Sequence, residues 1–147
     1  MLAANEINAS RQIPIAPNLF EFSVEGARLI GSRCVKCGEV RFPVSDFCPQ
    51  CCTQTTETIP LSRRGTLYSF TVQRFQPPPP YRAPEKFEPY GVGMIELAEG
   101  LRVTAVLADA DPDSLCVGIE MELIVTTFFQ DEIGRDVLGY KFRRVLK

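Results

Sequence analysis

Four cysteines fall into two closely spaced pairs, a residue type and spacing that suit a bound metal ion. Their pattern is Cys-x2-Cys-x10-Cys-x2-Cys. Each pair can supply two corners of a tetrahedron, and Zn²⁺ prefers four thiolates in that geometry, at about 2.3 Å. A closed shell of four thiolates leaves no position for water or substrate, so we predict a structural zinc ion. The predicted ligands are Cys34, Cys37, Cys48 and Cys51.

Other interpretations of the cysteines stay open at this point. A disulfide, a redox-active dithiol or an iron site would use the same residue type. Cys52 follows Cys51 directly and could replace it as a ligand, although the two-residue spacing favours Cys51. Cys116 lies apart, and we interpret it as a small buried hydrophobic residue. A nucleophilic role for Cys116 is rejected because the sequence offers no histidine or other evident base to activate it.

The absence of histidine limits the chemistry further. It removes the Ser-His-Asp and Cys-His arrangements and the usual general base near neutral pH. It also removes the open three-histidine type of catalytic zinc site. An enzyme without histidine is possible, but the commonest catalytic machinery is missing.

Charge and hydropathy argue against some other classes of protein. The net charge is −2 and the sequence pI is about 5.2, whereas non-specific nucleic-acid binding needs a basic surface. No apolar run approaches the roughly 18–20 residues that span a bilayer, so no membrane association is expected. The chain start lacks a basic stretch followed by an apolar one, which argues against a signal peptide. We therefore expect reduced cysteines and a cytoplasmic location.

The elements that must position the cysteines are short. Residues 1–16 show no hydrophobic period and are expected to form an arm. A short helix is predicted over 17–26, because Phe20, Val24 and Ala27 would share one face. This helix would pack against the domain or bind a partner.

A compact hairpin is predicted to carry the first cysteine pair. Its two strands are Leu29–Arg33 and Val40–Pro43, and Gly38 suits the turn after the second cysteine. The Thr-rich segment 52–62 is expected to be irregular and to link the metal region to the remainder of the chain.

From Gly65 onward the sequence alternates with the period of β-strands. A helical turn over Asp111–Gly118 is predicted between the third and fourth strands, and this arrangement is typical of the OB-fold. The loop over 75–89 is long and contains Pro77-Pro78-Pro79-Pro80, which no strand ladder tolerates. The five predicted strands are Tyr68–Val72, Tyr90–Leu97, Leu101–Leu107, Met121–Val125 and Leu138–Phe142.

The predicted fold is therefore mainly β, with an N-terminal helix, a zinc-binding hairpin and a five-stranded OB-fold barrel. The three parts are expected to cover residues 1–28, 29–62 and 63–147.

In this order of features the chain resembles a family of acyl-CoA-associated proteins, whose members carry an N-terminal helix, a rubredoxin-like zinc ribbon and a C-terminal OB-fold. The likeness runs from about residue 17 to residue 145. Two departures are Cys52, where members often have glycine, and Phe20 and Phe22 in place of a frequent tryptophan. The motifs that carry the likeness are Cys34-Val-Lys-Cys-Gly38, Phe42-Pro43, Cys48-Pro-Gln-Cys51, Gly65-Thr-Leu-Tyr-Ser-Phe-Thr71, Pro89-Tyr90, Glu96-Leu-Ala-Glu-Gly-Leu-Arg102 and Val117-Gly118.

The resemblance implies a non-catalytic accessory subunit. Members of this family are partners of thiolase-fold enzymes, including thiolases and thiolase-like aldolases, and one member type is the small subunit of benzoylsuccinyl-CoA thiolase. The thiolase-fold subunit carries the nucleophilic cysteine. The small subunit helps to form the site for coenzyme A or an acyl-CoA thioester and stabilises the assembly, so a hetero-oligomer is expected. The Pro-rich loop could then cover an acyl chain or contact the partner.

Basic residues around the predicted ribbon are compatible with this implied role. Segment 31–64 has five basic residues against three acidic ones. Arginine and lysine bind phosphates such as those of coenzyme A by charge-assisted hydrogen bonds, although solvated surface charge is the simpler explanation for any one of them. The candidate coenzyme A ligands are Arg33, Lys36, Arg41, Arg63 and Arg64.

Two other functions use the same predicted elements. Zinc ribbons and OB-folds both occur in single-stranded nucleic-acid-binding modules. The segment from residue 65 onward has nine basic and twelve acidic residues, a net charge of −3, which disfavours that alternative. The third possibility is an electron carrier of the rubredoxin type, which would hold iron and be coloured.

Overall fold

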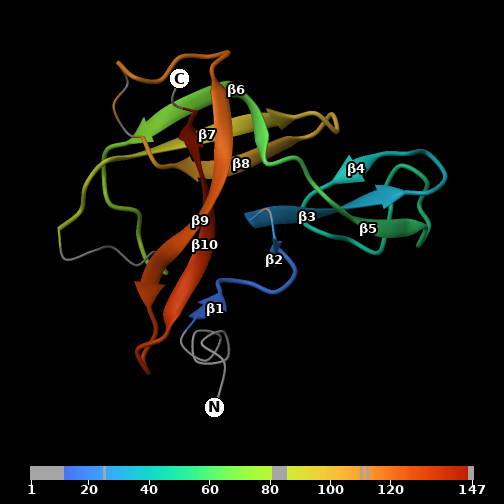
Figure 1. The fold of residues 1–147 in the computed structure, drawn as a ribbon, viewed down its shortest axis with the longest axis horizontal. Helices are drawn as coiled ribbons and strands as arrows, with labels where there is room; N and C mark the ends of the chain where they lie inside the picture. The colour runs from blue at the N-terminus through green and yellow to red at the C-terminus, as the bar shows by residue number, and fades with distance from the viewer. Residues whose placement is uncertain (1–11, 25, 81–85, 110, 112, 146–147) are drawn as a thin grey trace.

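The computed structural model describes residues 12–24, 26–80, 86–109, 111 and 113–145, and its regular elements there are ten β-strands (Figure 1). None of the described segments forms a helix with the length and hydropathy that a bilayer-spanning segment requires. The strands are β1 (Gln12–Pro14), β2 (Phe20–Ser23), β3 (Gly26–Cys34), β4 (Val40–Arg41), β5 (Thr56–Pro60), β6 (Arg64–Gln73), β7 (Tyr90–Leu97), β8 (Arg102–Leu107), β9 (Glu120–Gln130) and β10 (Asp136–Arg144).

Strands β6 to β10 close into the predicted OB-fold barrel. The neighbours run β10-β8-β7-β6-β9, and β9 pairs with β10 again to complete the ring. The β8–β10 pairing is parallel, whereas the other pairings within the ring are antiparallel. Along β8, buried Val103, Ala105 and Leu107 alternate with the more exposed Thr104 and Val106, which is the pattern of a sheet with one face in the core.

A smaller sheet, β2 to β5, forms the ribbon beside the barrel (Figure 1). Strand β3 lies at its centre and pairs antiparallel with the other three. Ribbon and barrel share one hydrophobic core, because fully buried Leu29 and Leu61 belong to the same cluster as the barrel side chains. Phe42 adds an edge-to-face ring contact with Tyr140 at a centroid distance of 5.6 Å. The barrel members of this cluster are Leu67, Ile95, Leu97, Val103, Ala105, Leu107, Leu115, Met121, Leu123 and Phe142.

The connection between ribbon and barrel is held by hydrogen bonds at three points. Leu61 donates its N–H to the carbonyl of Leu29, and Arg63 accepts one from the N–H of Leu123, each at 2.8 Å. Between them, the Glu99 carboxylate in the β7–β8 turn accepts from both the N–H (2.9 Å) and the hydroxyl (2.5 Å) of Ser62. A single carboxylate thus ties the linker to the barrel, and the ribbon is expected to keep a fixed orientation.

The predicted N-terminal helix is wrong. Instead, the described residues of 17–26 form a turn and strand β2, which pairs antiparallel with β3. Asn18 takes a positive φ of 60°, a conformation that interrupts a helix. Phe20 and Phe22 lie on the same side of β2, with an edge-to-face ring contact at a centroid distance of 5.8 Å, as the two-residue period of a strand requires. Phe20 packs against the core, whereas Phe22 is 65 % exposed.

Two further local predictions need correction. The described residues of Asp111–Gly118 form turns rather than helix, and Asp111 accepts a hydrogen bond from the N–H of Asp113 at 2.9 Å. The segment 52–62, expected to be irregular, contains β5 at Thr56–Pro60. The described part of the loop, 74–80 and 86–89, contains no strand, and its proposed role in covering a ligand stays a prediction.

Candidate metal centre

Two turns bring the cysteine pairs together. Cys34 ends β3, and Cys37 lies in the turn that leads to β4. Gly38 follows with a φ of +77° and donates its N–H to the carbonyl of Cys34 at 2.8 Å, as the glycine prediction requires. The second pair lies on a turn of the same length, in which Cys48 donates its N–H to the carbonyl of Thr53 at 2.9 Å, as Cys34 does to Glu39 at 3.0 Å.

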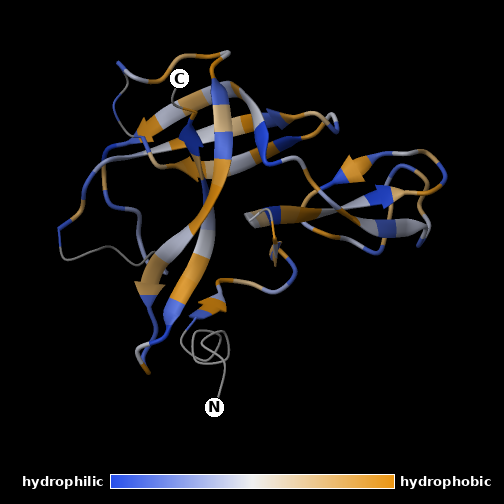
Figure 2. Cartoon of the chain, in the orientation of Figure 1, coloured by the Kyte–Doolittle hydropathy of each residue, from blue (hydrophilic) through white to orange (hydrophobic). Residues whose placement is uncertain are grey.

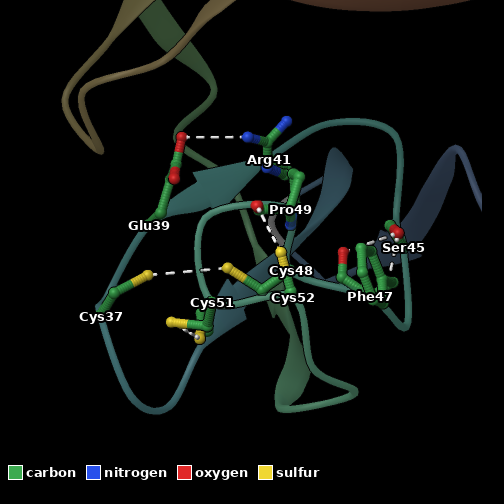
Figure 3. Close-up of polar contacts among 10 residues, drawn as sticks. Cys37, Glu39, Arg41, Ser45, Phe47, Cys48, Pro49, Cys51 and Cys52 are labelled. Carbon is green, nitrogen blue, oxygen red and sulfur yellow. Dashed lines mark hydrogen bonds and ion pairs between the residues drawn. The ribbon is translucent and has the colours of Figure 1, made fainter.

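The four sulfurs have the spacing of a tetrahedral thiolate site. The Sγ atoms of Cys37 and Cys48 are 3.7 Å apart (Figure 3), and those of Cys34 and Cys51 are 3.8 Å apart. All four lie within 4.8 Å of one another. Four sulfurs at about 2.3 Å from a central ion would be separated by about 3.8 Å, so the two short separations match a tetrahedral zinc site.

Hydrogen-bond donors around the first pair favour a thiolate. The Thr55 hydroxyl lies 3.1 Å from the Cys34 sulfur. It lowers the pKa of the Cys34 thiol to about 6, together with the backbone N–H of Cys37. By contrast, the hydrogen bond with the Cys37 thiol raises the pKa of Cys51 to about 12, because four clustered thiols cannot all ionise without a cation. The site is therefore built to hold a positive ion.

Cys52 lies outside the cluster of four ligands. Its Sγ is directed to the carbonyl of Pro49 at 3.5 Å, and its side chain is exposed (Figure 3). The residue has a φ of +56°, which L-residues with a side chain rarely adopt. The geometry thus separates Cys52 from the candidate ligands. Cys116 is also exposed, so its prediction as a buried hydrophobic residue is wrong.

We expect Cys52→Gly to stabilise the protein. The left-handed conformation costs a residue with a side chain about 1–2 kcal/mol, and glycine avoids this penalty but gains entropy in the unfolded chain. The expected net gain is about 0.5–1 kcal/mol in the free energy of unfolding, with the zinc content unchanged. Urea titration and metal analysis measure both quantities. A loss of zinc in this variant would instead assign Cys52 as a ligand.

The predicted basic residues lie at different places. Arg33 and Lys36 are exposed, on β3 and in the cysteine turn respectively. Arg41 on β4 forms an ion pair with Glu39 at 3.2 Å, while its buried Nε has no hydrogen-bond partner.

The two remaining basic residues belong to the junction with the barrel. The Arg63 guanidinium lies against Gly26 at the start of β3. Arg64 faces Glu120 at 3.4 Å and Glu122 at 3.7 Å, so two carboxylates already neutralise it. Of the five candidates, Arg33 and Lys36 are thus the exposed cations of the ribbon that face no carboxylate within ion-pairing distance among the described residues.

Sequence reasoning missed two polar residues that support this region. Thr55 contacts the Cys34 sulfur, and Glu99 holds the linker from 37 residues away. Thr55 lies in a Thr-rich stretch where no single residue is distinguished. The partner of Glu99 depends on how the ribbon folds against the barrel, and spacing along the chain gives no signal for it.

Comparison with known proteins places both halves of the chain in one family. Residues 27–55 match the family model described as the ChsH2 rubredoxin-like zinc ribbon domain. Residues 58–127 match the ChsH2 C-terminal OB-fold domain. The two matched segments follow the ribbon and the barrel of the structure.

Individual relatives cover most of the chain. The benzoylsuccinyl-CoA thiolase subunit BbsA of Thauera aromatica is 40 % identical over 131 residues, 88 % of this chain and 86 % of that protein. A DUF35 domain-containing scaffold protein of Methanocaldococcus jannaschii is 36 % identical, over 80 % of this chain and 82 % of its own. A solved structure titled Ltp2-ChsH2(DUF35) aldolase matches with a TM-score of 0.62 and 28 % identity, over 80 % of this chain and 84 % of that one. The chain therefore belongs to the ChsH2-type family of zinc-ribbon and OB-fold proteins, which includes the DUF35 scaffold proteins and the BbsA subunits.

Proposed function

We propose that this chain is a non-catalytic accessory subunit of a thiolase-type acyl-CoA enzyme or a thiolase-like aldolase. The observation that carries the proposal is the 40 % identity to a subunit of benzoylsuccinyl-CoA thiolase over both ribbon and barrel. The likeness to the Ltp2-ChsH2 aldolase structure points to the same kind of assembly. The chain itself has no histidine, and a closed set of four thiols offers no open coordination position for chemistry.

Within this role, the four cysteines would hold a structural zinc ion. The sulfur separations fit a tetrahedral thiolate shell, and the Thr55 hydroxyl and backbone N–H groups are aimed at the sulfurs. When bound, the ion supplies no reaction step and only crosslinks the two turns of the ribbon. Free thiol ligands suit a reducing compartment, so we place the assembly in the cytoplasm.

The finer part of the proposal concerns coenzyme A. Arg33 and Lys36 are exposed cations on the ribbon, and phosphates of a coenzyme A thioester are the anions that such side chains bind. Arg64 is a poorer candidate because Glu120 and Glu122 already face it. We propose that the ribbon contributes positive charge to a coenzyme A site completed by the catalytic subunit.

Affinity purification of the full chain from its native host tests the proposal. We expect a thiolase-fold protein with its own catalytic cysteine to co-purify in a stable ratio. Acyl transfer or aldol activity on CoA thioesters should belong to the complex, while the isolated chain should have none. Recovery of single-stranded nucleic acid in place of a thiolase-fold protein would support the nucleic-acid alternative and contradict the proposal.

The coenzyme A contribution is tested in the purified complex. We expect the double variant Arg33→Gln, Lys36→Gln to raise KM for the CoA thioester about fivefold, since exposed ion pairs contribute up to about 1 kcal/mol each. The value of kcat should change little, because neither residue would contact the reacting atoms. Arg64→Gln is the matched control and should leave KM within twofold. An unchanged KM in the double variant would exclude the ribbon charges while leaving the accessory role intact.

A further inference from the structure

A groove of about 280 Å³ lies on the outer face of the barrel, away from the cysteines. Its floor comes from β7 and β8, the second and third strands of the barrel, and its wall comes from the β9–β10 hairpin. Strands two and three form the face on which OB-folds bind their ligands. The lining residues are Ile15, Val92, Thr104, Ala105, Val106, Phe128, Gly139 and Tyr140.

The lining is apolar and offers few free hydrogen-bonding groups. Val92 and Val106 are paired across β7 and β8 and project on the same outer face. The Tyr140 hydroxyl already donates to the carbonyl of Thr104 at 3.1 Å. A sugar or a nucleic-acid base would leave its polar groups unsatisfied here, whereas a hydrocarbon chain or ring would not.

The wall of the groove depends on a close contact between Phe128 and Gly139. A Cβ at Gly139 would meet the Phe128 ring at 2.6 Å, so only glycine leaves room for the ring in this position. The projecting end of the β9–β10 hairpin carries hydrophobic segments (Figure 2). The Phe128 ring is thus packed against the backbone of β10, which holds it in place at the side of the groove.

A positive charge lies at the edge of this apolar groove. Lys141 is the cross-strand partner of Val106, and its ammonium lies 5.3 Å from the centroid of the Phe128 ring. Within the described ranges no carboxylate lies within ion-pairing distance of Lys141. An ammonium beside an apolar lining is complementary to a molecule with an apolar body and an anionic group.

We infer that this groove binds an apolar organic anion, with the hydrocarbon against Val92, Val106 and Phe128 and the anionic group beside Lys141. The volume lies just below the roughly 300–1,000 Å³ of pockets for drug-sized ligands, so it suits one acyl-sized group rather than a whole coenzyme. The ligand is therefore a free carboxylic acid with a hydrocarbon body, because an acyl group bound as a thioester carries no charge to place beside Lys141. The site needs no catalytic partner, so it goes beyond the proposed function.

Titration of the zinc-loaded full chain with 4-phenylbutyrate, followed by amide NMR, tests this inference. We expect saturable shifts that are centred on Val92, Val106 and Gly139. The neutral analogue 4-phenylbutyramide should bind more weakly. Lys141→Gln should weaken the carboxylate about threefold to fivefold and leave the amide unchanged, as expected for one exposed ion pair. Lys86→Gln, which removes an exposed charge, is the matched control.

A second variant and a second ligand complete the test. Phe128→Ala should weaken both probes, and its amide spectrum shows whether the barrel is still folded. Titration with 4-phenylbutyryl-CoA, with free coenzyme A as its control, tests the need for a carboxylate: the uncharged acyl thioester should bind the groove no more tightly than 4-phenylbutyramide. The inference is wrong if no probe shifts the groove amides, or if Lys141→Gln affects acid and amide equally. Protection of the same amides by the catalytic subunit, with no binding of either probe, would assign the groove to a protein contact instead.

Discussion

Replacement of Cys37 or Cys48 by serine is expected to abolish stoichiometric zinc binding and to unfold the ribbon. A hydroxyl is a poor substitute for a thiolate, and the remaining three ligands would leave an open coordination position. Structural zinc sites contribute about 10–16 kcal/mol of apparent binding free energy, so the loss should be several kcal/mol. Because Leu29 and Leu61 belong to the barrel core, the barrel should also be destabilised. Metal analysis and urea unfolding measure the two effects.

The other two cysteines provide matched controls for this experiment. Cys116→Ser changes an exposed thiol that lies outside the cluster, and it should retain one zinc ion per chain. Cys52→Ser should do the same, because Cys52 is adjacent to the cluster without belonging to it. Removal of the metal with a chelator should reproduce the loss of stability. Full zinc content in Cys37→Ser, or bound iron in the native protein, would contradict the predicted site.

Leu61→Ala is expected to cost about 2–5 kcal/mol and to release the ribbon from the barrel. Leu61 is fully buried, and its methyl groups lie about 3.0 Å from the position that a Cβ on Gly31 would occupy. Its removal would leave a cavity at the junction of the two sheets. Urea unfolding gives the stability, and amide hydrogen exchange in β3 and β5 shows whether the ribbon opens first.

Truncation of an exposed residue of similar type is the control, because it shortens a side chain without disturbing the junction between the two sheets. Ile133 is 75 % exposed in the β9–β10 turn, and Ile133→Ala should change the free energy of unfolding by less than about 0.5 kcal/mol. Leu61→Ala could instead destabilise the barrel and leave amide hydrogen exchange in β3 unchanged. This result would show that the ribbon folds independently of the barrel, contrary to what their shared core indicates. If the accessory role is right, Leu61→Ala should also reduce recovery of the catalytic partner.

The barrel and the cysteine pairs could be predicted because their signals are local. The spacing of the two pairs already determines which sulfurs can meet, and the structure brings those four together. Strand β7 has the predicted bounds, since Gly91, Gly93 and Ile95 alternate with less buried neighbours. Gly100 takes a φ of +93° in the predicted β7–β8 turn. In each case the pattern reflects the element itself rather than its surroundings.

The errors arose where tertiary pairing decides the local structure. Phe20, Val24 and Ala27 fit a helical period, but three residues in so short a segment are weak evidence for a helix, and Val24 is fully exposed in the structure. Pairing with β3 selects the strand, because Phe20 then packs against the shared core. The Thr-rich segment was misread for the same reason, since Thr56–Pro60 acquires its ladder from β3. Both segments pair with β3, and neither segment indicates this partner in its own sequence.

The Glu99 contact has a consequence for exchanging parts between relatives. Glu99 accepts hydrogen bonds from both the main-chain N–H and the hydroxyl of Ser62, so the ribbon's angle to the barrel is encoded partly in a barrel residue. A chimera that joins this ribbon to the barrel of a relative would keep the native angle between ribbon and barrel only if that barrel has an acidic residue in the same turn. Whether a ribbon and a barrel from two relatives fit together should therefore depend more on the residue at this one position than on their overall sequence similarity.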